Sequence, residues 1–429
     1  MPNPLSIAAK GKGFLPMLAR GRTIVSRYGL TPGRMNNALA ALQEPLSKYA
    51  CSATIPVTAS ALASNPAAAK KQSFQGLELA IHGLHHLDYS MLNLDQQLKH
   101  FNDAQAIFQR MGIPASGFRC PYLRWNEDTL TALKANGFTY DSSQAQVWDV
   151  VGGLSTDAYL RALDFYRAQS TNEFPALPDW SDNLIRIPYS LPDDEALVDR
   201  LHITNVSIMA DIWLAMLDRA FQTGELFTLG LHPERAPACQ GALQAVLAKA
   251  RSLDPGVWVA RLDKIAEWYR SLGQATFEIE SEGGGLYYIK ISAPDRSTVL
   301  ARAPEIIAAT QAWDVDFRVV LANQFFIQCD KRPVLGLDPD SPPSLERFLR
   351  SQGYLVERSS DANANTIYLD RHSFNLQDEK GLLAELARSH QPLVRLSRWP
   401  DEARCGLAIT GDVDAFTIWD YARRILVNE

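Results

Sequence analysis

Short apolar runs alternate with longer amphipathic segments between about residues 34 and 272. Each run has the length of one strand, and the runs cover 51–59, 77–83, 117–121, 184–188, 226–233 and 257–262. The segments between them carry apolar residues at helical spacing, as in 35–50, 94–112 and 126–137. Near-continuous apolar strands separated by helices are typical of a parallel sheet buried on both faces. Because many such units follow one another, we predict a parallel (β/α) barrel rather than an open sheet.

The pattern changes near residue 274, where helical spacing gives way to short strands. Residues 275–292 read as two strands joined by a Gly-rich turn, and further strand patterns with a helix at 344–353 follow. We therefore predict three parts: the main portion of an α/β barrel at 1–273, a second α/β domain at 274–398, and one more strand and helix at 399–429. The middle part has no GxGxxG or Walker pattern, so it suggests no chemistry of its own.

Composition narrows the class of protein only slightly. Lys and Arg number 42 against 48 for Asp and Glu, which gives no electrostatic reason to expect nucleic acid or an anionic membrane as a partner. The five cysteines are scattered without a CxxC pair, as expected in a reducing compartment. The N-terminal segment lacks the apolar core of a signal peptide, and no stretch reaches the roughly 18 apolar residues of a membrane span. These features predict a cytoplasmic protein.

Two histidines follow the apolar run that ends at Ile81. In an extended strand His82 and His86 would lie about 13 Å apart, too far to bind one ion. If the backbone turns helical between them they meet on one face, so we expect such a turn and a shared metal ion. An isolated HxxxH is more often a pair of polar loop residues, and His85 between them is expected to pack or line a rim. The interpretation therefore depends on neighbouring motifs.

Two further motifs stand at the ends of later apolar runs. Arg119-Cys-Pro-Tyr122 ends the run at 117–121, and Leu231-His232-Pro233 ends the run at 226–233. A histidine held at the tip of a buried strand can act as a general acid. Taken alone, each motif is weak, because Arg and Pro often stabilise turns and a single His is more often a rim residue.

In combination, these three motifs resemble the polysaccharide deacetylase family, the NodB-homology domain of the carbohydrate esterase type. Its members carry HxxxH, then RxPY or RxPF, then a late LxH, each at the end of a barrel strand. The order and spacing match over about residues 30–270, where 29–59 also resembles the helix and second strand of such domains. The resemblance implies a metal-dependent hydrolase that removes an N-acetyl group from an amino sugar of a polysaccharide or its precursor. The expected partner is thus an N-acetylated carbohydrate.

The opening motif of that family, a strand ending in an Asp pair, is missing upstream of residue 30. The last apolar strand instead ends in Asp412-Val-Asp414, and alternate strand residues point to the same side, about 6.6 Å apart. We therefore predict a circular permutation, in which the C-terminal strand completes the N-terminal barrel. Two alternatives stay open: a surface turn of the second domain, or completion of a neighbouring chain's barrel in a homo-oligomer.

The resemblance also implies a metal site. Its ligands would be Asp414, His82 and His86, which leaves positions for water and substrate. Such a set of ligands suits a divalent metal ion. We expect zinc first, although cobalt, nickel and manganese also bind such a set.

The remaining roles implied by the resemblance are catalytic. Asp412 would be the general base, oriented by Arg119, and the backbone N–H of Tyr122 would bind the oxyanion. His232 would protonate the departing amine. The family's Asp that orients this histidine has no clean match, so we take Asp194 as the candidate for that role.

Several points stay open at the level of sequence. Asp193 competes with Asp194, and Asp179 is a weaker candidate. Three aromatic residues could stack on a sugar, although each is more often a core residue: Tyr89, Trp125 and Trp180. A deformylase or an allantoinase-like amide hydrolase would use the same groups, and a carbohydrate-binding relative could keep the fold without the chemistry.

Overall fold

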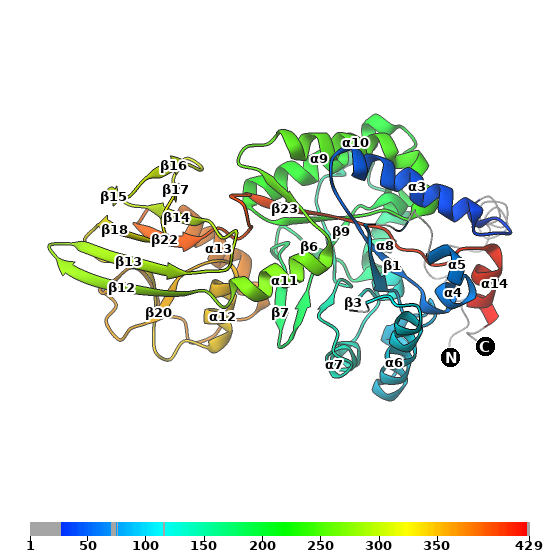
Figure 1. Ribbon diagram of the computed structural model, residues 1–429, viewed down its shortest axis with the longest axis horizontal. Coiled ribbons are helices and arrows are strands. Elements are labelled where there is room, and N and C mark those ends of the chain that lie inside the picture. The colour runs from blue at the N-terminus through cyan, green and yellow to red at the C-terminus, as the bar shows by residue number, and fades with distance from the viewer. Residues whose placement is uncertain (1–26, 70–73, 75, 115, 427–429) are drawn as a thin grey trace.

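The computed structural model describes residues 27–426 with the exceptions of 70–73, 75 and 115. Figure 1 shows a large lobe, in which helices surround a curled sheet, and a smaller lobe made mostly of strands. A C-terminal strand, drawn in red, runs from the side of the smaller lobe into the large one. The predicted start of the barrel at 1–26 lies outside the described residues.

The large lobe is built on a parallel sheet of short, buried strands. In spatial order the central strands are β10 (Leu226–Gly230), β23 (Cys405–Thr410), β1 (Thr54–Val57), β2 (Glu78–Ile81), β3 (Gly117–Phe118) and β4 (Tyr140–Asp141). Next to β4 comes β8 (Leu184–Arg186); β4 runs on into β5 (Ala145–Val147), and β8 into β9 (Tyr189–Leu191). Because β5 pairs with β9 and β9 with β10, the sheet curls back toward its starting strand. The expected curled parallel sheet of barrel type is confirmed.

The strand β23 lies in the middle of this sheet although it comes last in the chain. It pairs in parallel with β10 from Leu226–Gly406 to Gly230–Thr410, with β1 at its end, and with β11 (Val257–Val259) at its start. All of its residues are buried. Gly406 is needed here, because a Cβ atom would meet the side chain of Leu226 at 2.8 Å. The C-terminal strand therefore completes the barrel of its own chain.

Helices cover the outside of the sheet. The long ones are α3 (Gly33–Lys48), α6 (Leu94–Arg110), α7 (Glu127–Ala135), α8 (Asp157–Tyr166), α9 (Val206–Thr223), α10 (Ala236–Ser252) and α11 (Leu262–Leu272). Two of them begin with a capping box, at Asn93 and at Asn126, where the cap side chain accepts a hydrogen bond from the third helical N–H. Their apolar faces bury residues such as Leu39 and Trp213, each contributing about 1.5–3 kcal/mol by leaving water.

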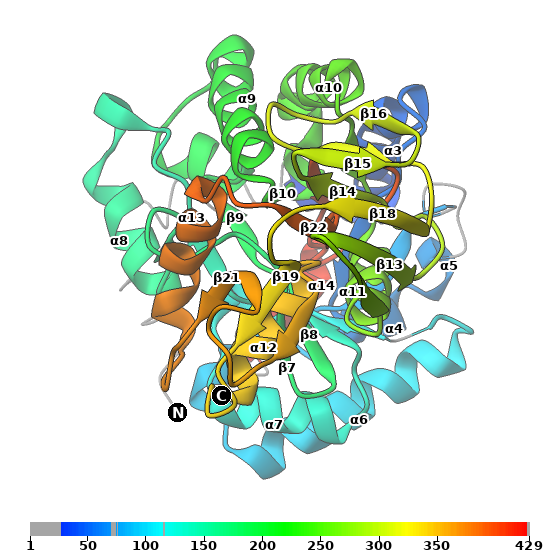
Figure 2. The same cartoon turned by 90° about the vertical axis from the view of Figure 1, so that its left-hand side faces the viewer.

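The smaller lobe carries three small sheets within the described residues. One is antiparallel, with β12 (Thr276–Gly283), β13 (Leu286–Ser292), β18 (Gln324–Gln328) and β15 (Glu305–Ile307). A second has β16 (Thr310–Ala312), β17 (Arg318–Val320), β14 (Val299–Arg302) and β22 (Leu393–Leu396). The third is parallel, with β20 (Val356–Arg358), β19 (Arg332–Leu337) and β21 (Asn365–Leu369), and the lobe also holds α12 (Pro343–Ser351) and α13 (Glu379–Arg388). Figure 2 looks onto these strands, with the barrel helices behind them.

Polar contacts and a shared apolar core join the two lobes. Trp268 in α11 donates a hydrogen bond to the backbone oxygen of Arg398 at 2.8 Å, and Trp399 donates to that of Gly224 at 2.9 Å. Lys380 of α13 contacts Glu225, which directly precedes β10. The boundaries at 273/274 and 398/399 stay predictions, because residues on both sides of them share one packed core.

Short strands were the elements that the apolar pattern predicted least well. Only the first part of the predicted run at 184–188 is a strand, β8, and β9 begins directly after the run; neither β4 nor β5 was foreseen. Two edge strands, β6 (Gln169–Ser170) and β7 (Asp179–Ser181), were missed as well. Strands of two or three residues are too short to show a periodicity. None of the described helices combines the length and the apolar character needed to span a bilayer.

Candidate active site

His82 and His86 lie at the end of β2, where the chain bends instead of forming the predicted helical turn. Residues 82–88 have no helical hydrogen-bond pattern, so that expectation was wrong. Gly83 makes the bend, with φ +75°, a left-handed value that favours glycine. A Cβ atom on Gly83 would meet the backbone oxygen of His85 and the ring of Tyr89 at 2.9 Å. The tight bend thus brings the two imidazoles together by another route.

Asp414 faces both imidazoles from the segment after β23. Its Oδ1 lies 3.5 Å from Nε2 of His82 and 3.2 Å from Nε2 of His86. One ligand atom from each of the three side chains lies within 4.8 Å of the others. The Nδ1 atom of His82 is hydrogen-bonded to the backbone oxygen of Arg119 at 2.9 Å, which turns Nε2 toward the cluster. Two imidazole nitrogens and one carboxylate oxygen are the donor set of an open divalent-metal site, so these residues fit the predicted ion.

Arg119 holds Asp412 from the next strand end. The guanidinium Nη1 donates to Asp412 Oδ1 at 2.7 Å and to Thr410 Oγ1 at 3.0 Å, and Nε donates to the backbone oxygen of Ser142. Burial alone would raise the pKa of Asp412, but the charge of Arg119 holds that pKa below its usual value. His82 and His232 act in the same direction. Asp412 is therefore a carboxylate at neutral pH, as a proton acceptor must be.

His232 is fixed by Asp194. Its Nδ1 lies 2.7 Å from Asp194 Oδ1, and its backbone N–H donates to Asp194 Oδ2 at 2.6 Å. Burial lowers the pKa of His232, but the fully buried carboxylate of Asp194 outweighs it and raises the pKa well above the usual value. A histidine held in this way is a proton donor near neutral pH.

The rival candidates for the orienting carboxylate have other contacts. Asp193 accepts hydrogen bonds from the Tyr189 hydroxyl at 2.6 Å and from the Ala196 backbone N–H at 2.7 Å. Burial and the neighbouring charge of Asp194 raise the pKa of Asp193 to about 6. Asp179 lies in the edge strand β7, where Arg186 partly offsets the effect of its burial. Geometry therefore favours Asp194 among the three.

Tyr122 follows β3 in an unusual backbone conformation. Its φ of 59° and ψ of 11° lie in the left-handed region, which is uncommon for a residue with a Cβ atom and often marks a functional loop. Its ring meets that of His86 edge-on at a centroid distance of 4.4 Å. Tyr122 thus borders the His82–His86–Asp414 cluster, and the role of its N–H group in binding an oxyanion stays a prediction.

The sequence patterns missed the groups that hold Arg119. Ser142 Oγ accepts a hydrogen bond from Nη2 at 2.9 Å, and the ring of Tyr189 lies 4.6 Å from the guanidinium carbon. The glycine at position 230 is the one indirect signal of Tyr189 in the sequence. A Cβ atom there would meet the Tyr189 hydroxyl at 1.8 Å, so only glycine fits at this position of β10. Of the aromatic candidates for sugar stacking, Tyr89 is fully buried against Phe101.

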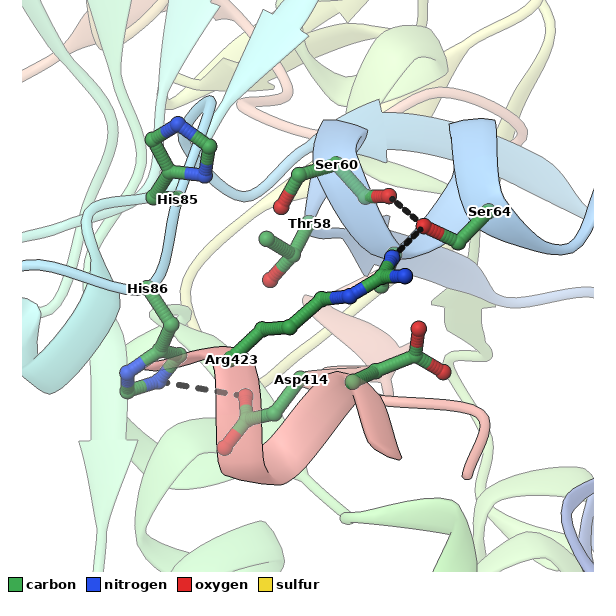
Figure 3. A pocket seen from close by; sticks show the side chains of 9 residues that line it. Thr58, Ser60, Ser64, His85, His86, Asp414 and Arg423 are labelled. Atoms are coloured by element: carbon green, nitrogen blue, oxygen red, sulfur yellow. Dashed lines mark hydrogen bonds and ion pairs between the residues drawn. The ribbon is translucent and has the colours of Figure 1, made fainter. Parts of the chain in front are cut away.

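A pocket opens beside this cluster. It is about 180 Å³ in volume and is bordered by His85, His86 and Asp414 on one side. Figure 3 shows the other side, made by the short helix α4 (Ala59–Ser64) and by the C-terminal helix α14 (Ile418–Leu426). The cluster is therefore open to a ligand of modest size.

Fold and site together define a class: an α/β protein of barrel type whose His–His–Asp cluster, at the carboxyl ends of parallel strands, is of the kind used by metal-dependent hydrolases. Residues 29–140 match the family model described as polysaccharide deacetylase, so this segment of the chain is similar to that family. The resemblance found in the sequence is confirmed.

Individual relatives are at most 29% identical to this chain in the matches described below. A peptidoglycan deacetylase-like protein of Gibberella zeae is 29% identical over 118 residues, which are 26% of this chain and 34% of the relative. The chain thus matches only about a third of that relative's length. Two solved structures of candidate polysaccharide deacetylases, from Mycobacterium smegmatis and Pseudomonas aeruginosa, are each 21% identical and cover 54% of this chain. They are themselves covered to 76% and 73%, with TM-scores of 0.41 and 0.43.

Proposed function

We propose that the protein is a metal-dependent hydrolase that removes the N-acetyl group of an amino sugar in a polysaccharide or its precursor. The observation that carries this proposal is the arrangement of two charged pairs around one ligand cluster. The Arg119–Asp412 pair would supply a proton acceptor, and the Asp194–His232 pair a proton donor. The two pairs interact, because the charge of His232 lowers the pKa of Asp412. Hydrolysis of an amide needs both groups, one to activate water and one to protonate the leaving nitrogen.

The metal, held by Asp414, His82 and His86, would polarise the amide carbonyl and lower the pKa of a water molecule. Asp412 would take the proton of that water, because Arg119 keeps it ionised and fixes one of its oxygens. The other carboxylate oxygen is then available to the water. Zinc is the ion we propose, and its identity is a matter for the test below.

His232 would give its proton to the amine nitrogen as the C–N bond breaks. The hydrogen bond from Nδ1 to Asp194 leaves Nε2 as the donor toward the substrate. Tyr122 would bind the developing negative charge on the carbonyl oxygen through its backbone N–H, as the family resemblance implies. The strained conformation of Tyr122 supports a functional role for this loop.

We further propose that the chain order arose by circular permutation. The strand β23 and helix α14 would correspond to the first strand and helix of the family's domain. Two contacts support this: the Ile418 N–H donates to the Gly29 backbone oxygen at 2.9 Å, and the rings of Tyr28 and Tyr421 lie 5.4 Å apart. Helix α14 thus lies next to the first described residues, where the two segments would once have been joined. A cytoplasmic location also stays a proposal.

The direct test is product analysis with the metal removed and restored. Protein treated with a chelator is loaded with zinc, cobalt, nickel or manganese and incubated with N-acetylglucosamine oligomers, with formamido sugars and with allantoin. We expect acetate release from the first substrate and none from chelated protein. Formate release or ring opening of allantoin would support the alternative amide hydrolases instead. Metal uptake without turnover of any substrate would favour a non-catalytic binding protein.

A further inference from the structure

The pocket beside the metal-ligand cluster has a positively charged side that the proposed chemistry does not use. Arg423 reaches into it from α14, opposite His86 and Asp414, and Figure 3 shows its side chain lying along the pocket toward Ser64. Because α14 belongs to the same C-terminal segment as Asp414, this cation and the third ligand are carried by one short stretch of chain.

Most hydrogen-bond donors of the Arg423 guanidinium are not used within the described residues of the protein. Its Nη1 donates to Ser64 Oγ at 2.7 Å, and Ser64 in turn donates to the backbone oxygen of Ser60 at 3.0 Å. Within the part of the chain that the structure describes, this is the one hydrogen bond of Arg423, and no carboxylate forms an ion pair with it. A neutral hydroxyl orients the group without neutralising it. Nε and Nη2 can therefore donate to a ligand.

Besides Asp414, the pocket is lined by one more acidic residue, Asp420, whose contacts lie elsewhere. Asp420 is 7% exposed, and its Oδ2 accepts hydrogen bonds from the backbone N–H and the hydroxyl of Thr417 at 3.0 and 2.8 Å, and from Asn65 Nδ2 at 2.9 Å. These contacts fix the first turn of α14. Asp420 thus holds the helix that carries Arg423 in place and leaves the guanidinium to the pocket.

We propose that Arg423 is a specificity-determining residue that binds an anionic group, a carboxylate or a phosphate, carried by the N-acetylated sugar. The inference rests on the proposed function and names the substrate class of the same site. Guanidinium groups bind both anions with two parallel hydrogen bonds. The pocket of about 180 Å³ is below the usual size of ligand sites, so it holds the reacting sugar and its immediate substituents. The anion therefore belongs to the reacting unit itself or to the bond next to it.

The test compares three substrates that differ in one substituent. They are the neutral methyl glycoside of N-acetylglucosamine, N-acetylmuramic acid with its carboxylate, and N-acetylglucosamine 1-phosphate. We expect kcat/KM for acetate release to be higher for at least one anionic substrate than for the neutral one. Arg423→Ala should lower the ratio of kcat/KM for the anionic substrate to kcat/KM for the neutral substrate about tenfold or more. Arg423→Lys should restore part of this ratio. The substrate with the larger ratio identifies the anion.

The matched control is Arg110→Ala, which removes an exposed Arg whose one described hydrogen bond is to Ala106 of its own helix. It should leave the ratio unchanged. A purely structural role of Arg423 would lower kcat/KM equally for all three substrates, and an unchanged ratio in Arg423→Ala would overturn the inference.

A binding measurement separates this inference from the proposed function. Calorimetry with chelated protein measures the affinity for N-acetylglucosamine 1-phosphate and N-acetylmuramic acid without any turnover. Anion binding that weakens about tenfold in Arg423→Ala, together with no acetate release from any substrate, would keep the anion site and refute the deacetylase. Acetate release without any dependence of binding on Arg423 would do the reverse.

Discussion

The two segments that build the site contribute in different ways. The segment from His82 to His232 distributes its groups over the ends of β2, β3 and β10, with His82 and His86 together after β2, and supports them by neighbours such as Ser142 or Asp194. The C-terminal segment places two carboxylates, Asp412 and Asp414, on one stretch of chain with a single residue between them. The spacing between the proposed general base and the proposed metal ligand is thus set by one short segment after β23, whereas the proposed proton donor is positioned separately. Disturbing the C-terminal segment should therefore affect more functions at once.

The largest effect is expected from removing the C-terminal segment after Pro400. The loss takes away a central strand whose residues are all buried, so the barrel loses both hydrogen-bonding partners and core, and metal binding and acetate release should fall to background. Calorimetric unfolding and zinc titration would measure this. A truncated chain that still binds zinc and turns over substrate would contradict the assignment of β23 to the barrel. The purified 401–429 peptide added in trans serves as the control for simple misfolding.

Asp412→Asn tests whether Asp412 and Asp414 have separate roles. The amide keeps the shape of the side chain but cannot take a proton, so we expect kcat to fall about 10³-fold while zinc affinity stays within a few-fold of the parent. His86→Ala is the matched variant, because it should weaken zinc binding first and lose activity for that reason. Equal loss of zinc binding in both variants would mean that base and ligand roles are not separate.

The proposed assignments come largely from the sequence, because the motifs that resemble the family's lie at strand ends and the missing Asp pair could be sought at the other end of the chain. The choice of Asp194 over Asp193 rested on no distinct sequence signal, and the structure shows that Asp194 is the one that meets His232. The bend at Gly83 was mistaken for a helical turn because both conformations bring His82 and His86 together. Ser142 and Tyr189 carry no spacing signal, as they act through Arg119.

Asp194→Asn should show that the proton donor is adjusted independently of the C-terminal strand. Asp194 raises the pKa of His232, so its loss should lower that pKa and leave less imidazolium at neutral pH. We expect kcat/KM to fall about 10–100-fold, with the alkaline limb of its pH profile moved to lower pH. Zinc affinity should not change. Asp193→Asn is the control, and a shift of the alkaline limb in that variant instead would reassign the orienting role.

The smallest effect concerns the smaller lobe, which contacts the barrel without contributing to the site. Glu379 of α13 is buried, and burial followed by the charge of Asp179 raises its pKa to about 9. A carboxyl whose pKa is raised in the folded state stabilises the fold least at high pH: its contribution is complete below the unfolded pKa and is lost as pH rises toward 9. Glu379→Gln should therefore stabilise the protein by on the order of 2 kcal/mol at neutral pH, and by little near pH 4.

Urea unfolding of both proteins across this pH range measures the difference. Activity under native conditions should be unaltered, because Glu379 lies outside the site. A gain that does not grow with pH would show that the benefit comes from packing rather than from the protonation of Glu379 in the folded state, and a change in activity would show that the two lobes are coupled.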